Sequence, residues 1–162
     1  MTDRKETDSE ERARLRAASR LAAVQALYQM DLSGRGAKAV AEEFLEVRFR
    51  EEGAERPIVE ADEDLFSDIL SGVVATQAEI DGAVKDALAK GWTLPRLDAT
   101  VRAILRCGAY ELMKRPDVPA RVVIDQYVDV AHAFFEGPEP GFVNAALDTC
   151  ARKVRADELK AK

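Results

Sequence analysis

Few residues of this chain could carry chemistry, and those few do not form a catalytic group. The only histidine, His132, lies among small and apolar residues of a helical pattern, with no second ligand or nucleophile at a useful spacing. The sequence contains no GxSxG, HExxH, Walker or GxGxxG motif. We therefore expect no enzyme activity, no metal and no cofactor, and we interpret the chain as a binding protein.

The main binding signal is a group of arginines near the N-terminus. Arg12, Arg16 and Arg20 recur every four residues, so on a helix they form a slowly drifting stripe. Residues 11–30 are basic, although the net charge of the 162-residue chain is −6. Such a local basic edge is the electrostatic footprint of phosphate binding. Tyr28 follows on the same predicted helix and could stack on an unpaired base.

The charged residues also have a simpler interpretation. The arginine stripe could be a solvated helix end that pairs with the acidic N-terminal residues, and the spacing alone does not decide between the two. Asp125 and Asp129 lie four residues apart and face the same way on a helix. This arrangement is typical of a solvated face, although an exposed acidic ridge can also receive a basic partner.

The length predicts a single domain, and the N-terminal residues predict a cytoplasmic protein. The content is 47% hydrophobic and 33% charged, and the net charge of −6 argues against a general nucleic-acid coat protein. No run of about 18 apolar residues predicts a membrane helix, and the N-terminus lacks the apolar stretch of a signal peptide. Cys107 and Cys150 have no CxxC spacing, which predicts two buried, reduced thiols.

Apolar residues recur at helical spacing throughout, which predicts an all-α bundle. We expect a disordered tail over residues 1–11, one helical domain over residues 12–155 and a flexible C-terminus over residues 156–162. Asp98 is the expected N-cap of a central helix, and Gly34 is expected to end the first. The predicted helices cover roughly residues 10–32, 37–52, 65–88, 99–114, 120–135 and 142–155.

Several sequence motifs occur together and in a fixed order. They are LAAVQALYQMDLSG at residues 21–34, WTLPRLD at 92–98, RAILR at 102–106, AYEL at 109–112, DVP at 117–119 and FVNAALD at 142–148. With the basic stretch that precedes them, these motifs resemble the NusB family of bacterial transcription antitermination factors over roughly residues 12–155. A chance similarity between two helical bundles would not reproduce the last three motifs together.

This resemblance implies a compact all-α bundle of two small helical subdomains packed at an angle. It also implies binding to single-stranded boxA RNA as a heterodimer with NusE, a small-subunit ribosomal protein. That complex would join RNA polymerase with other Nus factors and suppress premature termination, notably in ribosomal RNA operons. The candidate RNA-binding residues are Arg12, Arg16, Arg20, Tyr28 and Phe142, and the candidate partner-binding residues are Leu97, Asp98, Arg102 and Arg106.

The chain departs from the family pattern just before the last motif. Family members often carry Asp-Ser-x-Lys there, whereas this chain has Pro-Glu-Pro-Gly at residues 138–141, which removes one phosphate contact and stiffens the loop. Tyr28 and Phe142 could also be core or capping residues.

Two other functions fit a helical bundle of this kind. One is the NusB-like domain that some ribosomal-RNA cytosine methyltransferases carry, and the other is a scaffold without RNA. We expect the stand-alone factor, because nothing follows residue 162 and no glycine-rich cofactor loop is present. A homodimer that hides the RNA edge is a further state open to the free protein.

Overall fold

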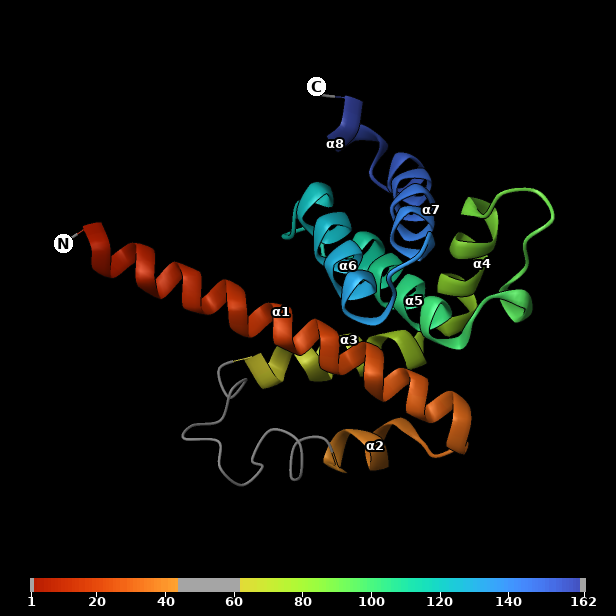
Figure 1. Ribbon diagram of the computed structural model, residues 1–162, viewed down its shortest axis with the longest axis horizontal. Coiled ribbons are helices and arrows are strands. Elements are labelled where there is room, and N and C mark those ends of the chain that lie inside the picture. Colours follow the sequence, from red (N-terminus) through yellow and green to blue (C-terminus); the bar gives the residue numbers. More distant parts are fainter. Residues whose placement is uncertain (1, 44–61, 161–162) are drawn as a thin grey trace. The chain divides into compact units, whose positions relative to one another are not determined.

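Helices form the regular structure of this protein. A computed structural model describes residues 2–43 and 62–160, and no strand occurs within these ranges (Figure 1). The predicted all-α fold is therefore confirmed. The elements are α1 (Thr2–Ser33), α2 (Ala37–Glu43), α3 (Glu63–Ala75), α4 (Gln77–Ala87), the 3₁₀ turn η3 (Leu94–Arg96), α5 (Ala99–Lys114), α6 (Ala120–Phe134), α7 (Glu139–Val154) and α8 (Ala156–Lys160).

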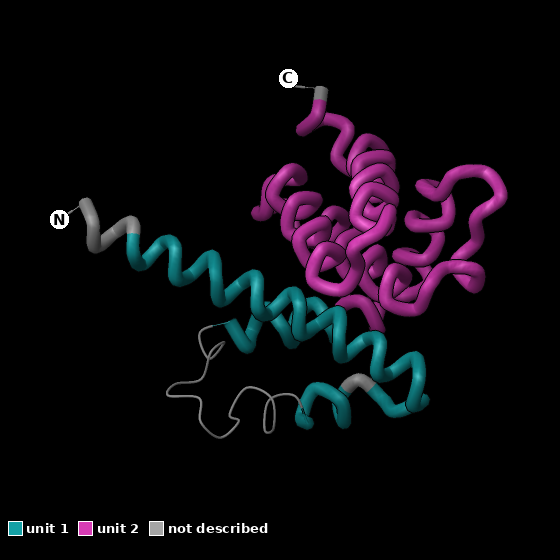
Figure 2. The backbone as a smooth tube through the Cα atoms, viewed as in Figure 1, with its two compact units in different colours: residues 1–71 teal, residues 72–162 magenta. Residues whose placement is uncertain are grey.

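The chain divides into two compact units, and the boundary lies inside α3. Unit 1 comprises residues 1–71 and unit 2 comprises residues 72–162 (Figure 2). The single domain expected over residues 12–155 is thus made of two parts, in agreement with the two helical subdomains that the family resemblance implied.

Unit 1 has a small apolar core to which α1, α2 and α3 contribute. The buried side chains of α1 follow helical spacing, which gives the helix one apolar face. Gly34 ends α1 with a φ of 74°, a conformation that glycine adopts without strain, and its N–H donates to Met30 O at 2.9 Å. Among the described residues of this unit, the buried apolar ones are Ala22, Ala23, Val24, Ala26, Leu27, Val40, Leu65, Phe66, Ile69 and Leu70.

The structure differs from the sequence prediction at both ends of the chain. Helix α1 begins at Thr2, so residues 2–11 are helical where a disordered tail was expected. Lysine, arginine and glutamate are good helix formers, and Arg14 pairs with Glu11 one turn before it at 3.3 Å. At the other end, α8 is anchored by Glu158, which accepts a hydrogen bond from the Ala120 N–H at 2.8 Å.

Unit 2 is a bundle in which α5, α6 and α7 pack against one another and α4 packs against α5 and α7. Gly108 lets α5 approach α7 closely, because a β-carbon there would lie 2.9 Å from the Leu147 methyl groups. In the core, the Tyr127 hydroxyl donates to Glu111 Oε2 at 2.5 Å, and both residues are fully buried. The buried Arg155 satisfies carbonyls at the end of α5 and just beyond, those of Glu111, Leu112, Arg115 and Val118.

Two helix boundaries also differ from the prediction. The helix expected over residues 65–88 is interrupted at Thr76, whose backbone leaves the helical range and whose hydroxyl donates to Gly72 O at 2.7 Å. Helix α7 starts at Glu139 instead of Phe142, because the proline that follows fits the first helical turn. The later part of the second predicted helix, and the loop after it, lie outside the described residues.

Candidate nucleic-acid interface

The arginine stripe lies on α1 in unit 1, and its members differ strongly in exposure. Arg12 is exposed, Arg16 is half-buried and only 3% of Arg20 is exposed. Each step of four residues turns the side chain by about 40° around the helix, so the stripe winds from solvent toward the core. Two of the three predicted phosphate contacts, Arg12 and Arg16, therefore lie where a phosphate could reach them.

The Asp62 carboxylate, just before α3, lies close enough to the stripe to feel the charges of all three arginines. Burial raises the pKa of Asp62 above its ordinary value of 3.8, and the charges of Arg16, Arg20 and Arg12 oppose this rise. The Ser19 hydroxyl on α1 donates to the Asp62 backbone carbonyl at 2.9 Å, which ties the two segments together. The arginine edge of α1 (Arg12, Arg16 and Arg20) is thus partly balanced by one acidic group within its own unit.

Tyr28 is half-buried on α1, eight residues after Arg20, which turns its side chain a further 80° or so around the helix. Its ring therefore does not point along the same line as the exposed arginines. A partly exposed ring is compatible both with packing and with stacking on a base, so its role stays a prediction.

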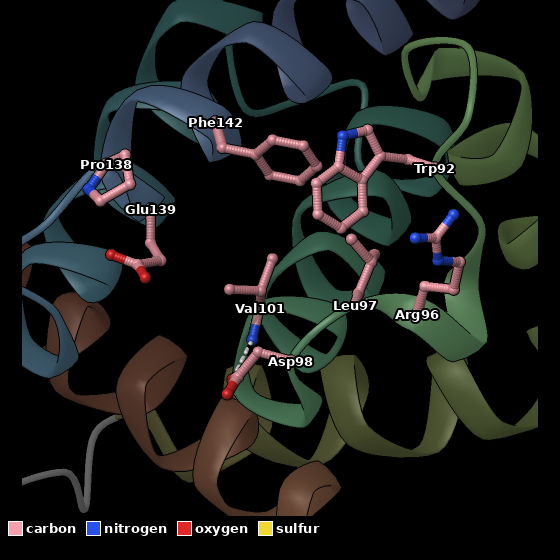
Figure 3. A pocket seen from close by; sticks show the side chains of 8 residues that line it. All are labelled: Trp92, Arg96, Leu97, Asp98, Val101, Pro138, Glu139 and Phe142. Atoms are coloured by element: carbon pink, nitrogen blue, oxygen red, sulfur yellow. Dashed lines mark hydrogen bonds between the residues drawn. The ribbon is translucent and has the colours of Figure 1, made fainter.

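Phe142 lies in unit 2, on the first turns of α7, beside a partly open hollow of about 360 Å³. Its ring meets the Trp92 ring edge to face, with centroids 5.6 Å apart and an interplanar angle of 63°. Figure 3 shows both rings at one side of this hollow. We call it the aromatic hollow, and it is lined by Trp92, Arg96, Leu97, Asp98, Val101, Pro138, Glu139 and Phe142.

Phe142 also borders a second hollow of about 330 Å³, lined by residues at the end of α4 and along α7. Phe142 therefore lines both hollows, and it is only half-buried. An aromatic ring in such a position can contact flat ligands on the surface, as single-stranded nucleic-acid binders require.

A family model for NusB matches residues 17–152 of this chain. The chain belongs to the NusB family. This is a family of transcription antitermination factors without catalytic activity, and the predicted absence of an enzyme agrees with it. A relative from Maricaulis maris (strain MCS10), named transcription antitermination protein NusB, is 60% identical over 98% of this chain and 99% of its own length.

Solved structures share the fold. A Thermotoga maritima NusB structure has a TM-score of 0.75 and 24% identity, covering 90% of this chain and 96% of that chain. A crystal structure of the antitermination factors NusB and NusE in complex with double-stranded RNA has a TM-score of 0.73 and 23% identity, covering 86% of this chain and 98% of that chain. At these identities the likeness establishes the fold.

In this NusB-family chain, the four predicted partner-binding residues all have intramolecular contacts. Leu97 is buried, and Asp98 Oδ1 caps α5 by accepting from the Thr100 and Val101 N–H groups at 2.8 and 3.3 Å. Arg102 donates to the carbonyls of Leu94 and Leu97 at 3.0 and 3.1 Å. Of the four, Asp98 is exposed and Arg102 half-buried, so these two remain the better predictions for a partner contact.

Arg106 is the most enclosed of the four. Its Nε and Nη2 atoms donate to both carboxylate oxygens of Asp81 on α4, at 2.8 and 3.0 Å. Only 9% of its side chain is exposed, so this bidentate pair holds α5 against α4 inside unit 2. Arg106 is therefore expected to hold α5 in place and not to contact a partner directly.

Sequence reasoning did not select Trp92 or Arg96 as site residues. Trp92 is 46% exposed, and the Arg96 guanidinium lies 5.9 Å from the centre of its ring. Their spacing of four residues across a proline turn was the available signal, and it was interpreted only as a bend. The structure brings both beside Phe142, which is distant in sequence.

The two cysteines of this NusB-family chain lie inside unit 2. Cys107 and Cys150 are buried and free, and burial raises the pKa of Cys107 and that of Cys150, the latter to about 11. Within the described ranges, no three or more His, Cys, Asp or Glu side chains gather as a metal site would need. None of the helices described there is long and apolar enough to cross a membrane.

Proposed function

We propose that this protein binds boxA-type single-stranded RNA as a heterodimer with NusE. The complex joins elongating RNA polymerase with other Nus factors in the cytoplasm, and suppresses premature termination, notably on ribosomal RNA operons. The observation that carries this proposal is membership of the NusB family, together with a relative named for transcription antitermination that spans nearly the whole chain.

Two kinds of interaction hold the RNA: ionic contacts with its phosphates and stacking on one of its bases. Arg12 and Arg16 contact phosphates, which positions the strand without reading its sequence. Arg20 is buried and close to Asp62, so it does not contact RNA but helps to hold this part of α1 in place. Phe142 offers an aromatic face to an unpaired base, a contact worth about 1–3 kcal/mol in other single-strand binders.

NusE supplies the positive charge that this chain lacks. The net charge of −6 repels phosphate at long range, and only two arginines of the stripe reach solvent. A basic ribosomal protein docked on an acidic surface extends the positive field and counters this repulsion. Exposed Asp125 and Asp129 on α6 form an acidic ridge that can attract such a partner.

Filter binding with a boxA-type oligonucleotide tests the proposal directly. The heterodimer should bind it more tightly than this protein alone, because the protein alone has few phosphate-neutralising residues. The Arg12→Ala, Arg16→Ala double variant should weaken binding to boxA and scrambled RNA alike. Arg121→Ala, an exposed arginine of α6 in the other unit, is the matched control and should bind as the parent does. Equal affinity with and without NusE would contradict the heterodimer mechanism.

A further inference from the structure

The aromatic hollow of unit 2 has two faces of different chemistry. Trp92 and Phe142 supply flat apolar walls, and Leu97 and Val101 supply an aliphatic floor. Glu139 and Asp98 lie at the margin away from the Trp92 ring (Figure 3). A hollow that joins flat apolar walls to a few polar atoms is the usual form of a site for a planar ring.

Its charge selects a neutral ring over a phosphate. Among the described residues that line the hollow, Arg96 is the one cation, whereas Asp98 and Glu139 are both acids. The Arg96 guanidinium is already engaged, because Nη1 donates to the Gly91 carbonyl at 2.9 Å and the group lies over the Trp92 ring. A phosphate placed here would face two carboxylates, whereas a neutral base would bury apolar surface against the rings.

The polar atoms at the margin accept hydrogen bonds. Asp98 uses one oxygen, Oδ1, to cap α5, which leaves the second oxygen of the same carboxylate on a fixed side chain. Glu139 stands on the first turn of α7, next to the rigid Pro138–Pro140 segment. Carboxylates accept from N–H groups and repel carbonyl oxygens. The hollow therefore favours a base whose edge carries donors.

From this geometry we infer that the aromatic hollow binds one unpaired guanine base of the RNA. The inference rests on the proposed function, and it names the base that this part of the site reads. Guanine offers two adjacent donors, N1–H and the N2 amino group, which can reach the two oxygens of one carboxylate. Uracil offers a single N–H flanked by two carbonyls, which the acids would repel. One ring of the Trp92–Phe142 pair stacks on the base, the other ring is inclined to it at 63° and contacts its edge, and Glu139 accepts hydrogen bonds from the N–H groups of the base.

The test compares oligonucleotides of equal charge on the parent protein in complex with NusE. The probes are a uridine dodecamer with one central guanosine and its forms with inosine, adenosine or uridine at that position. The guanosine probe should bind about tenfold more tightly than the uridine probe, as for other bidentate base contacts. Inosine lacks the N2 amino group and should lose most of this preference. Equal affinity for guanosine, inosine and uridine probes would overturn the assignment.

Variants locate the preference in the hollow. Glu139→Gln should reduce the guanosine-over-uridine ratio while all probes still bind, and Glu136→Gln, an exposed glutamate of the preceding loop, should leave the ratio unchanged. Trp92→Ala should weaken every probe, and Trp92→Phe should restore part of the loss. The control for a lost exposed aromatic is Phe134→Ala on α6, which should have no effect.

The two proposals fail in distinguishable ways. If the guanosine preference is absent but the heterodimer binds boxA-type RNA and depends on Arg12 and Arg16, the base assignment is wrong and the proposed function stands. If the heterodimer binds none of these RNAs, the proposed function itself has failed. A guanosine preference that persists at full size in Glu139→Gln and Trp92→Ala would place the guanine outside the hollow.

Discussion

The arginine edge of α1 and the aromatic hollow of unit 2 are built in opposite ways. The edge comes from a single helix, and its long side chains need only the four-residue spacing to lie together. The hollow is assembled from a bend, the start of α5 and the start of α7, and each wall is held by contacts inside unit 2. A charge site can therefore be specified locally, whereas a stacking site depends on the packing of distant segments.

The largest expected effect is a loss of stability when the ion pair between α5 and α4 is broken. Arg106→Ala leaves the Asp81 carboxylate without its bidentate partner, and should lower the free energy of unfolding by about 3 kcal/mol. For a chain of this size, that corresponds to a fall of about 10 °C in the melting temperature. Calorimetry or a circular-dichroism melt measures it.

The control is Lys114→Ala, which breaks a more exposed pair with Glu79, and should cost less than about 1 kcal/mol. If the two variants had the same melting temperature, Arg106 would not hold α5 against α4. The hollow would then depend less on packing within unit 2 than we propose.

The next effect concerns stacking. Phe142→Ala removes a ring that lines both hollows and should reduce RNA affinity by about 1–3 kcal/mol. Because no charge changes, the dependence of affinity on salt should keep its slope. Half-burial of Phe142 makes a folding control necessary, so melting temperatures are compared first, and a large drop would assign the loss to packing.

The edge and the hollow also differ in how far the sequence predicts them. Helical spacing and the Asp98 cap are local signals, and they correctly predicted α5 over Ala99–Lys114. The same local spacing predicted the arginine stripe. It could not predict the burial of Arg20, because that burial depends on the packing of the segment around Asp62, just before α3, against α1.

Other differences have the same origin. The interruption at Thr76 comes from a side-chain hydroxyl that bonds to the preceding turn, although the apolar periodicity continues across it. The pairing of Trp92 with Phe142 joins residues fifty positions apart, so no local pattern contains it. Helical order over residues 2–11 was missed because low apolar content was taken as disorder, although these residues have high helix propensity.

The smallest expected effect comes from Asp62, the acid close to the arginine edge of α1. Asp62→Asn removes a negative charge that competes with phosphate for Arg12 and Arg16, so RNA affinity should rise on the order of twofold at low salt. Asp64→Asn, an exposed acid on the first turn of α3, is the control for a simple change in net charge. An equal rise in affinity for both variants would mean that Asp62 does not compete with phosphate for Arg12 and Arg16, and that only the net charge matters.

Stability should change in the same variant. The pKa of Asp62 is raised in the folded state, so the folded protein holds this proton to higher pH than the unfolded chain does. Its contribution to stability is present below the ordinary pKa of 3.8 and is lost as the pH rises through the raised value. Melting curves at several pH values should show this loss in the parent and a smaller one in Asp62→Asn.

The division of labour between edge and hollow is tested most directly by the salt dependence of RNA binding. Affinities of the NusE heterodimer for boxA-type RNA are measured across a salt series with the parent, the Arg12→Ala, Arg16→Ala variant and Phe142→Ala. The logarithmic slope should fall by about 1.4 or less for the double arginine variant, and the Phe142→Ala line should run parallel to the parent. A double arginine variant with the slope and affinity of the parent would contradict the account, because the edge of α1 would then contact no phosphate.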